Sequence, residues 1–168
     1  MEALKNDIPE ELSNLELTPY QRIFYNEWLL NPLSSDYNLV IDNVLTGDLD
    51  IDRHNKSLIR FVNENLLISS NVAEKDGKLY WAQRTPIADT DTLIKYYPDG
   101  LSEEELLADV VKPFDLENEL LVRFYVIKQG AQSFRCIYIF QHILGDGVLV
   151  NIIPVIFFVD TFFVSSSK

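Results

Sequence analysis

The chain has 168 residues, of which 26 are acidic and 14 are basic, so its formal net charge at pH 7 is −12. Its lysines and arginines form no continuous run, which argues against nucleic acid as a partner because phosphate binding requires clustered cations. Two histidines and one cysteine supply no ligand set for a metal ion. The length suffices for one compact domain with a sizeable hydrophobic core.

The N-terminal part of the sequence predicts a lead-in, a helix and a strand. Residues 1–16 are acidic and polar and lack the apolar run of a signal peptide, so we expect a cytoplasmic protein. Thr18 is placed to cap a helix that Pro19 begins, and the Asn-Pro pair at 31–32 ends it. Alternating apolar residues then predict a strand over 37–45.

A second helix is predicted after Asp50, which is the expected N-cap. Its stripe toward the core consists of Ile51, Asn55, Leu58, Ile59, Val62 and Leu66. This register puts His54 on the outer side of the helix, so we expect its imidazole to be solvated.

The middle of the chain predicts a hairpin and a third helix. Segments 67–73 and 78–84 flank an Asp-Gly pair at 76–77, which is a strong signal for a two-residue turn between strands. Ser102 and Glu105 then form a capping box at the start of a third helix.

Two long strands follow, over 120–128 and 133–141, and we expect them to pair antiparallel around Gly130. The elements together predict an α/β chain of the α+β type, a two-layer sandwich in which helices pack on a mixed, largely antiparallel sheet. Cys136 falls within the last strand, so we expect a buried, unreactive thiol.

The C-terminal stretch 148–164 is almost entirely apolar and has no charged face, unlike an ordinary surface helix. It is short for a bilayer span, which needs about 20 residues, and Pro154 and Asp160 interrupt it, so we expect no membrane segment. The stretch instead predicts a buried helix whose second face packs on a partner, either a further lobe or another copy of the chain.

His142 stands where the last predicted strand ends, before an Asp-Gly pair at 146–147. An imidazole can take a proton from an attacking amine or hydroxyl and return it to a leaving group near neutral pH. In an arbitrary protein a strand-end histidine is more often structural than catalytic, so the surrounding motifs decide the interpretation.

Four motifs, in order along the chain, carry a family resemblance. They are Leu17-Thr18-Pro19-Tyr20-Gln21-Arg22, Leu49-Asp50-Ile51, Pro113-Phe114-Asp115-Leu116 and Gln141-His142-Ile143-Leu144-Gly145-Asp146-Gly147. The last resembles the His-His-x-x-x-Asp-Gly signature of the condensation domains of nonribosomal peptide synthetases, which are acyltransferases similar to chloramphenicol acetyltransferase. The resemblance implies a chloramphenicol acetyltransferase-like half-domain, with residues 17–168 as the N-terminal lobe and the second lobe absent. We expect the motif at 113–116 to be a packing turn.

The resemblance also implies a chemistry. An acceptor amine attacks a donor thioester, both held on 4′-phosphopantetheine arms of carrier proteins, and no cofactor is tightly bound. His142 would be the catalytic residue, the backbone amide of Gly147 would stabilise the oxyanion, and Asp146 would shape the active-site loop.

Two positions depart from the family pattern. Gln141 replaces the first signature histidine, and its amide can still hydrogen-bond the neighbouring backbone. The arginine that pairs with the signature aspartate falls at Ile68, which would leave Asp146 without its partner, and an unpaired carboxylate is costly to bury.

Three functions remain open. The first is the N-terminal part of a condensation domain, amide-forming in its complete form and inactive alone. The second is a non-catalytic, degenerate lobe that binds a carrier protein or another synthetase subunit. The third is an oligomeric acyltransferase that uses acyl-CoA and completes its cleft between copies of the chain.

Overall fold

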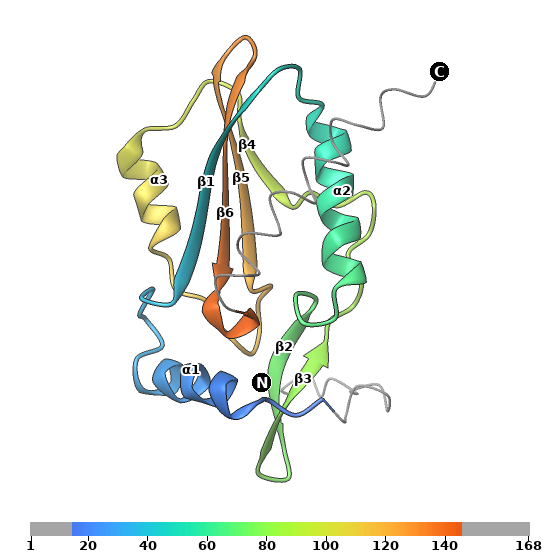
Figure 1. Ribbon diagram of the computed structural model, residues 1–168, viewed down its shortest axis with the longest axis vertical. Coiled ribbons are helices and arrows are strands. Elements are labelled where there is room, and N and C mark those ends of the chain that lie inside the picture. The colour runs from blue at the N-terminus through green and yellow to red at the C-terminus, as the bar shows by residue number, and fades with distance from the viewer. Residues whose placement is uncertain (1–14, 146–168) are drawn as a thin grey trace, which may run out of the picture.

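The computed structural model describes residues 15–145 of the chain, which form a central sheet with helices around it (Figure 1). The elements, in chain order, are α1 (Pro19–Leu30), β1 (Asn38–Thr46), α2 (Ile51–Glu64), β2 (Ser70–Lys75), β3 (Lys78–Gln83), β4 (Ile94–Tyr97), α3 (Glu103–Val110), β5 (Val122–Gly130), β6 (Ser133–Gln141) and the 3-10 turn η1 (His142–Leu144). The helix expected over 148–164 lies outside the described residues.

The main sheet has four strands in the order β1-β6-β5-β4. Strand β6 pairs antiparallel with β1 on one side and with β5 on the other, whereas β4 pairs parallel with β5. Helix α3 connects β4 to β5, because parallel neighbours need a long crossover. The predicted mixed, largely antiparallel sheet is therefore confirmed.

Helices cover the two faces of this sheet, with α3 on one side and α2 on the other (Figure 1). Arg135 of β6 reaches α3 by an ion pair with Glu103 at 2.5 Å. Tyr138, three residues further along β6, reaches α2 through a hydrogen bond between its hydroxyl and Nε2 of His54 at 2.9 Å. Side chains alternate along a strand, so these contacts fall on opposite faces.

The prediction that His54 is solvated was wrong. Its side chain is 1% exposed, and α2 buries it with Leu58 and Phe61, at steps of four and three residues. Leu58, Ile59 and Val62 of the predicted stripe are buried as expected, and the buried face is wider than predicted because it also includes His54 and Phe61. Burial lowers the pKa of His54 to about 4, so the imidazole is neutral at physiological pH.

Asn55, which the sequence assigned to the core stripe, lies at the edge of that face and fixes strand β4. Its side-chain oxygen accepts from the backbone N–H groups of Leu93, at 2.8 Å, and Ile94, at 3.1 Å. The sequence analysis missed β4, because a strand of four residues with only Ile94 buried gives little alternation.

Strands β2 and β3 form a two-stranded sheet of their own, beside α1 (Figure 1). The predicted turn is confirmed, since Asp76 and Gly77 both have positive φ angles, of 53° and 75°. The chain has already joined this sheet before α1 begins. Leu17 donates its N–H to Leu79, and Trp81 donates its N–H to Leu15.

The Pro-Phe-Asp-Leu motif is the packing turn that the sequence predicted. Phe114 is 3% exposed and Leu116 is fully buried. The carboxylate of Asp115 accepts from the backbone N–H groups at 117 and 118, which holds the turn. The carbonyl of Leu116 accepts from Val72, so the turn also ties the hairpin to the main core.

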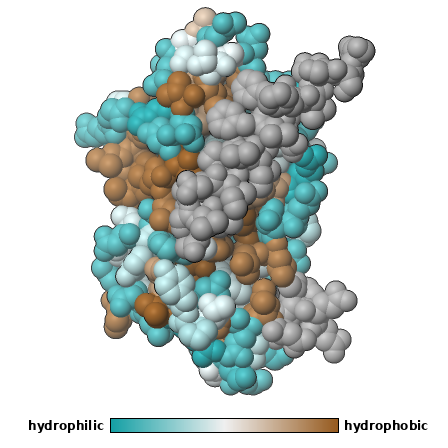
Figure 2. Space-filling model, viewed as in Figure 1, coloured by the Kyte–Doolittle hydropathy of each residue, from teal (hydrophilic) through white to brown (hydrophobic). Residues whose placement is uncertain are grey.

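Apolar side chains are exposed along the edge strand β1 and the neighbouring helix α3. Figure 2 shows this surface as a brown area over the two elements. Val40, Val44, Leu107 and Val111 are between 43% and 59% exposed. A hydrogen bond from the Asn38 side chain to the carbonyl of Val110 holds the two elements together.

No helix within residues 15–145 has both the length and the apolar character that crossing a bilayer requires.

Candidate functional site

His142 is the first residue of η1, directly after the last residue of β6, so the predicted strand-end position is confirmed. Its backbone N–H donates to the carbonyl of Tyr37, just before β1, at 2.9 Å. Its own carbonyl accepts from Gly145 at 3.2 Å, which closes the turn. The backbone at His142 is thus fixed on both sides, and the half-buried side chain lies at the end of the inner strand β6.

The imidazole of His142 packs on aromatic side chains of α1. Its ring stacks on Phe24, with centroids 4.6 Å apart and planes inclined by 22°. Tyr20, one helical turn earlier, approaches edge-on at 6.4 Å and is 54% exposed. Helix α1 therefore supplies one wall beside the imidazole, buried at Phe24 and open to solvent at Tyr20.

Nδ1 of His142 is buried and has no hydrogen-bond partner within the described part of the chain. In a Ser-His-Asp triad, by contrast, a carboxylate at this nitrogen fixes the tautomer and the ring orientation. In this chain the imidazole of His142 is held instead by its stacking on Phe24 and by the backbone hydrogen bonds of the turn.

Gln141 is 5% exposed and turns its side chain inward. Its amide oxygen accepts from the backbone N–H of Ile143 at 2.6 Å, which caps the start of η1. The expectation that glutamine can hydrogen-bond the neighbouring backbone is confirmed, and the replacement leaves the turn supported.

Asp146 and Gly147 lie outside the described residues, so their predicted roles stay predictions. Ile68, the position at which the sequence analysis expected the partner arginine, is 3% exposed and belongs to the hydrophobic core. Arg22 and Arg123, two other arginines of this lobe, pair with Glu16 and Glu119.

Three residues of α1 that the sequence analysis gave no role at the site lie against the His142 turn. Tyr20 and Gln21 belong to the first family motif, and Phe24 follows that motif on the same helix. The side chain of Gln21 donates to the carbonyl of Ile143 at 3.3 Å, across 122 residues of sequence. Spacing along the chain carries no signal for such a contact.

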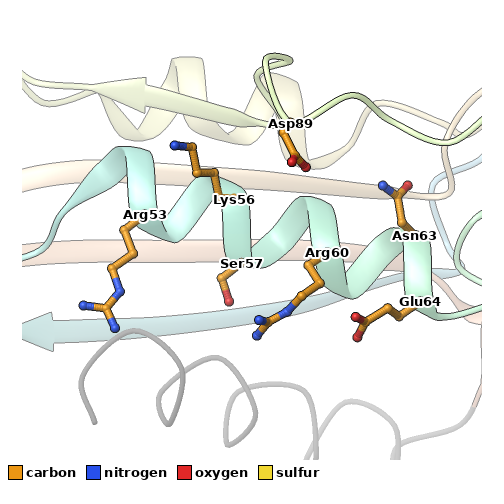
Figure 3. A pocket seen from close by; sticks show the side chains of 7 residues that line it. All are labelled: Arg53, Lys56, Ser57, Arg60, Asn63, Glu64 and Asp89. Carbon is orange, nitrogen blue, oxygen red and sulfur yellow. The ribbon is translucent and has the colours of Figure 1, made fainter. Parts of the chain in front are cut away.

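A pocket of about 580 Å³ lies along α2, away from His142 (Figure 3). Arg53, Ser57, Arg60 and Glu64 point to one side of the helix, whereas Lys56 and Asn63 point toward the segment that carries Asp89. The lining of this pocket contains both acidic and basic side chains and includes no residue of the His142 turn. This pocket is therefore separate from the turn that carries His142.

Cys136 has the environment that the sequence predicted. The thiol is 1% exposed, and burial raises its pKa to about 12, so it stays protonated and unreactive at physiological pH. Within the described residues, no group of three or more metal-ligating side chains is present.

The comparisons with known proteins agree on one family. The family model described as "Condensation domain" matches residues 12–158. Bacitracin synthase 1 of Bacillus licheniformis is 28% identical over 143 residues, covering 82% of this chain and 3% of the relative. Surfactin synthase subunit 1 of Bacillus subtilis (strain 168) is 25% identical over 137 residues, covering 81% of this chain and 4% of the relative. The chain thus spans a small fraction of these relatives.

Solved structures show the same fold at low identity. The starter condensation domain of rhizomide synthetase RzmA superposes with a TM-score of 0.76 at 17% identity, over 92% of this chain and 38% of that one. The first condensation domain of the calcium-dependent antibiotic synthetase, in complex with substrate analogue 3a, gives 0.76 at 16% identity, over 85% and 37%.

Proposed function

This chain belongs to the condensation-domain family, and we propose that it forms one wall of a peptide-bond-forming site, namely the wall on which His142 lies. The complete site joins acyl or aminoacyl thioesters on carrier proteins in nonribosomal peptide biosynthesis. The chain matches 38% of a solved condensation domain, so the opposite wall comes from sequence that this chain does not contain. The chain alone is then inactive.

The placement of His142 is the observation that carries this proposal. The imidazole lies at the open end of β6, beside the exposed Tyr20, and no carboxylate of the described residues holds its ring. A neutral imidazole there takes the proton of the acceptor ammonium, and the freed amine attacks the thioester carbonyl. The tetrahedral intermediate then collapses and the C–S bond breaks. The nitrogen gives its second proton to the departing thiolate, which leaves as a thiol, and the imidazolium releases the first proton to solvent.

Gly147 and Asp146 complete the proposed site. The backbone amide of Gly147 donates to the oxyanion of the intermediate, and Asp146 shapes the loop that presents it. The substrates arrive on 4′-phosphopantetheine arms, so carrier domains and other synthetase domains are the partners, and no cofactor is tightly bound. The cytoplasm, where such carriers are loaded, is the proposed compartment.

Mass spectrometry of two loaded carrier proteins, incubated with the purified chain, tests this proposal. We expect no amide product from the chain alone, together with weak binding of a loaded carrier that titration calorimetry detects. His142→Ala should leave this binding nearly unchanged. Product that forms and disappears in His142→Ala would contradict the one-wall proposal, and a chain that binds neither carrier would contradict the partner assignment.

Ile68 favours a second candidate function, a non-catalytic lobe that binds carriers or synthetase subunits. Its apolar side chain is built into the core where the family pattern has an arginine. To separate the candidates, His142 would be replaced in a complete protein containing this lobe. An unchanged rate of amide formation favours the binding module, whereas a lost rate favours the catalytic wall.

Self-association is the remaining proposal on partners. The apolar stretch 148–164 would pair copies of the chain, and the exposed valines and leucine of β1 and α3 would enlarge the contact. Sedimentation at tens of micromolar should then show a dimer or larger species. Transfer of an acyl group from acyl-CoA by that oligomer would instead support the acyltransferase alternative.

A further inference from the structure

The amide of Gln21 has only one orientation that satisfies its neighbours. Its oxygen accepts from the backbone N–H of Thr18 at 3.0 Å and from Nε1 of Trp81 at 3.4 Å. Both of these groups are donors, so the oxygen must face them. The NH₂ group is left to donate to the carbonyl of Ile143, at 3.3 Å. One side chain therefore links α1, β3 and η1.

Ile143 is the residue next to His142, and both its backbone groups are held by glutamines. Gln141 binds its N–H from the strand side, and Gln21 binds its carbonyl from the helix side. The imidazole of His142 has no partner at Nδ1 among the described residues, so its position depends on this turn and on the stacking with Phe24.

Gln21 and Phe24 lie three residues apart on α1 and thus share one helix face. Any shift of η1 away from Gln21 also moves His142 off the ring of Phe24. Trp81, which is 1% exposed, gives the Gln21 amide a rigid support from β3. The two contacts to the His142 turn are therefore coupled.

We propose that Gln21 is a positioning residue for His142: its amide bridges Trp81 and the carbonyl of Ile143 and so holds the imidazole on Phe24. This inference rests on the proposed role of His142 as the base. It assigns the first family motif a task at the site beyond capping a helix.

The test is the NMR signature of the two imidazoles, since the chain has only two histidines. The Cε1–H resonance of His142 should carry a ring-current shift from Phe24. Gln21→Glu keeps acceptors for Thr18 and Trp81 but cannot donate to the carbonyl of Ile143. Gln21→Met has a similar length, carries no charge and makes none of these bonds.

We expect both variants to lose the ring-current shift of His142 at a pH where both imidazoles are neutral. His54, buried under α2, should keep its resonance and report that the core is folded. Thr18→Ala is the matched control. It removes the hydroxyl that bonds Gln21 at the same helix end, but the Gln21 amide keeps the backbone N–H at position 18, Trp81 and the carbonyl of Ile143 as partners. Its His142 resonance should stay as in the wild type.

An unchanged His142 resonance in Gln21→Glu, or an equal change in Thr18→Ala, would overturn the proposal. If Gln21→Met unfolds, which the His54 resonance would reveal, Gln21→Glu decides alone. Carrier binding is measured separately on the same samples. A wild-type chain that shows the shift but binds no carrier would reject the proposed function and leave the positioning role standing.

Discussion

The two histidines of this chain occupy opposite environments. His54 lies between α2 and the main sheet, 1% exposed and hydrogen-bonded to Tyr138. His142 lies at the end of β6, stacked on a helix that borders solvent. Burial suppresses protonation of the first and makes it a structural residue, whereas the second has an open side. The same type of side chain thus serves packing at position 54 and, in the proposed function, chemistry at position 142.

The largest expected effect on the free energy of unfolding is that of His54→Ala, which is to be compared with that of His142→Ala. His54→Ala removes a fully packed side chain and takes a partner from the buried hydroxyl of Tyr138, so we expect a loss of about 3–4 kcal/mol in the free energy of unfolding. Urea denaturation at neutral pH measures it. A loss as small as that of an exposed substitution would mean that His54 is not part of the core.

Acid should weaken the fold through His54. Its folded pKa of about 4 lies below the ordinary 6.5, so the unfolded state binds its proton first as the pH falls. The contribution is therefore fully present above pH 6.5 and is lost as the pH falls toward 4, by up to about 3 kcal/mol. Denaturation curves across that window should show it.

His54→Gln is the control for this acid effect, because an amide can still bond Tyr138 but does not titrate. The carboxylates of the chain titrate in both proteins, so the difference between the two pH profiles isolates His54. Parallel profiles would contradict the lowered pKa.

A smaller effect is expected from Tyr138→Phe, which keeps the ring in the core and removes the hydroxyl that bonds His54. We expect a loss of about 1 kcal/mol in the free energy of unfolding. The pKa of His54 should stay below 6.5, because burial, rather than the hydroxyl, lowers it. An imidazole that titrates normally in this variant would show that the hydroxyl, rather than burial, sets the pKa.

The smallest effect on stability should come from His142→Ala. The imidazole is half-buried and its ring contact is with one wall, so we expect a loss of no more than about 1 kcal/mol. The same denaturation experiment compares it directly with His54→Ala. A larger loss would indicate that the stacking on Phe24 is structural and would weaken the assignment of this residue to chemistry.

Local signals explain what could be predicted from the sequence. Thr18 and Ser102 form capping boxes with residues three positions away, and the hairpin turn needs only its Asp-Gly pair. Such contacts join residues that are close in the sequence, and the hairpin and the helices α1, α2 and α3 lie where they were expected. The strand-end position of His142 followed from the alternation of β6.

Distant contacts explain what could not be predicted. Strand β4 is fixed by Asn55, nearly forty residues earlier, and the wall beside His142 comes from α1. His54 was misplaced because the spacing of residues along α2 does not show that its imidazole meets the buried hydroxyl of Tyr138, a residue 84 positions later in the chain. Each of these features depends on which elements meet in space, and periodicity within one element does not contain that information.

The pairing of residues 15–17 with β3 has a further consequence for how this protein opens. The hairpin is separate from the main sheet, yet it holds both the start of α1 and, through Trp81, the amide of Gln21. Partial unfolding of the hairpin would release α1 and dismantle the wall beside His142 while β1, β5 and β6 stay paired. Backbone amides of the hairpin and α1 should then exchange with deuterium as one cooperative unit, ahead of the central strands.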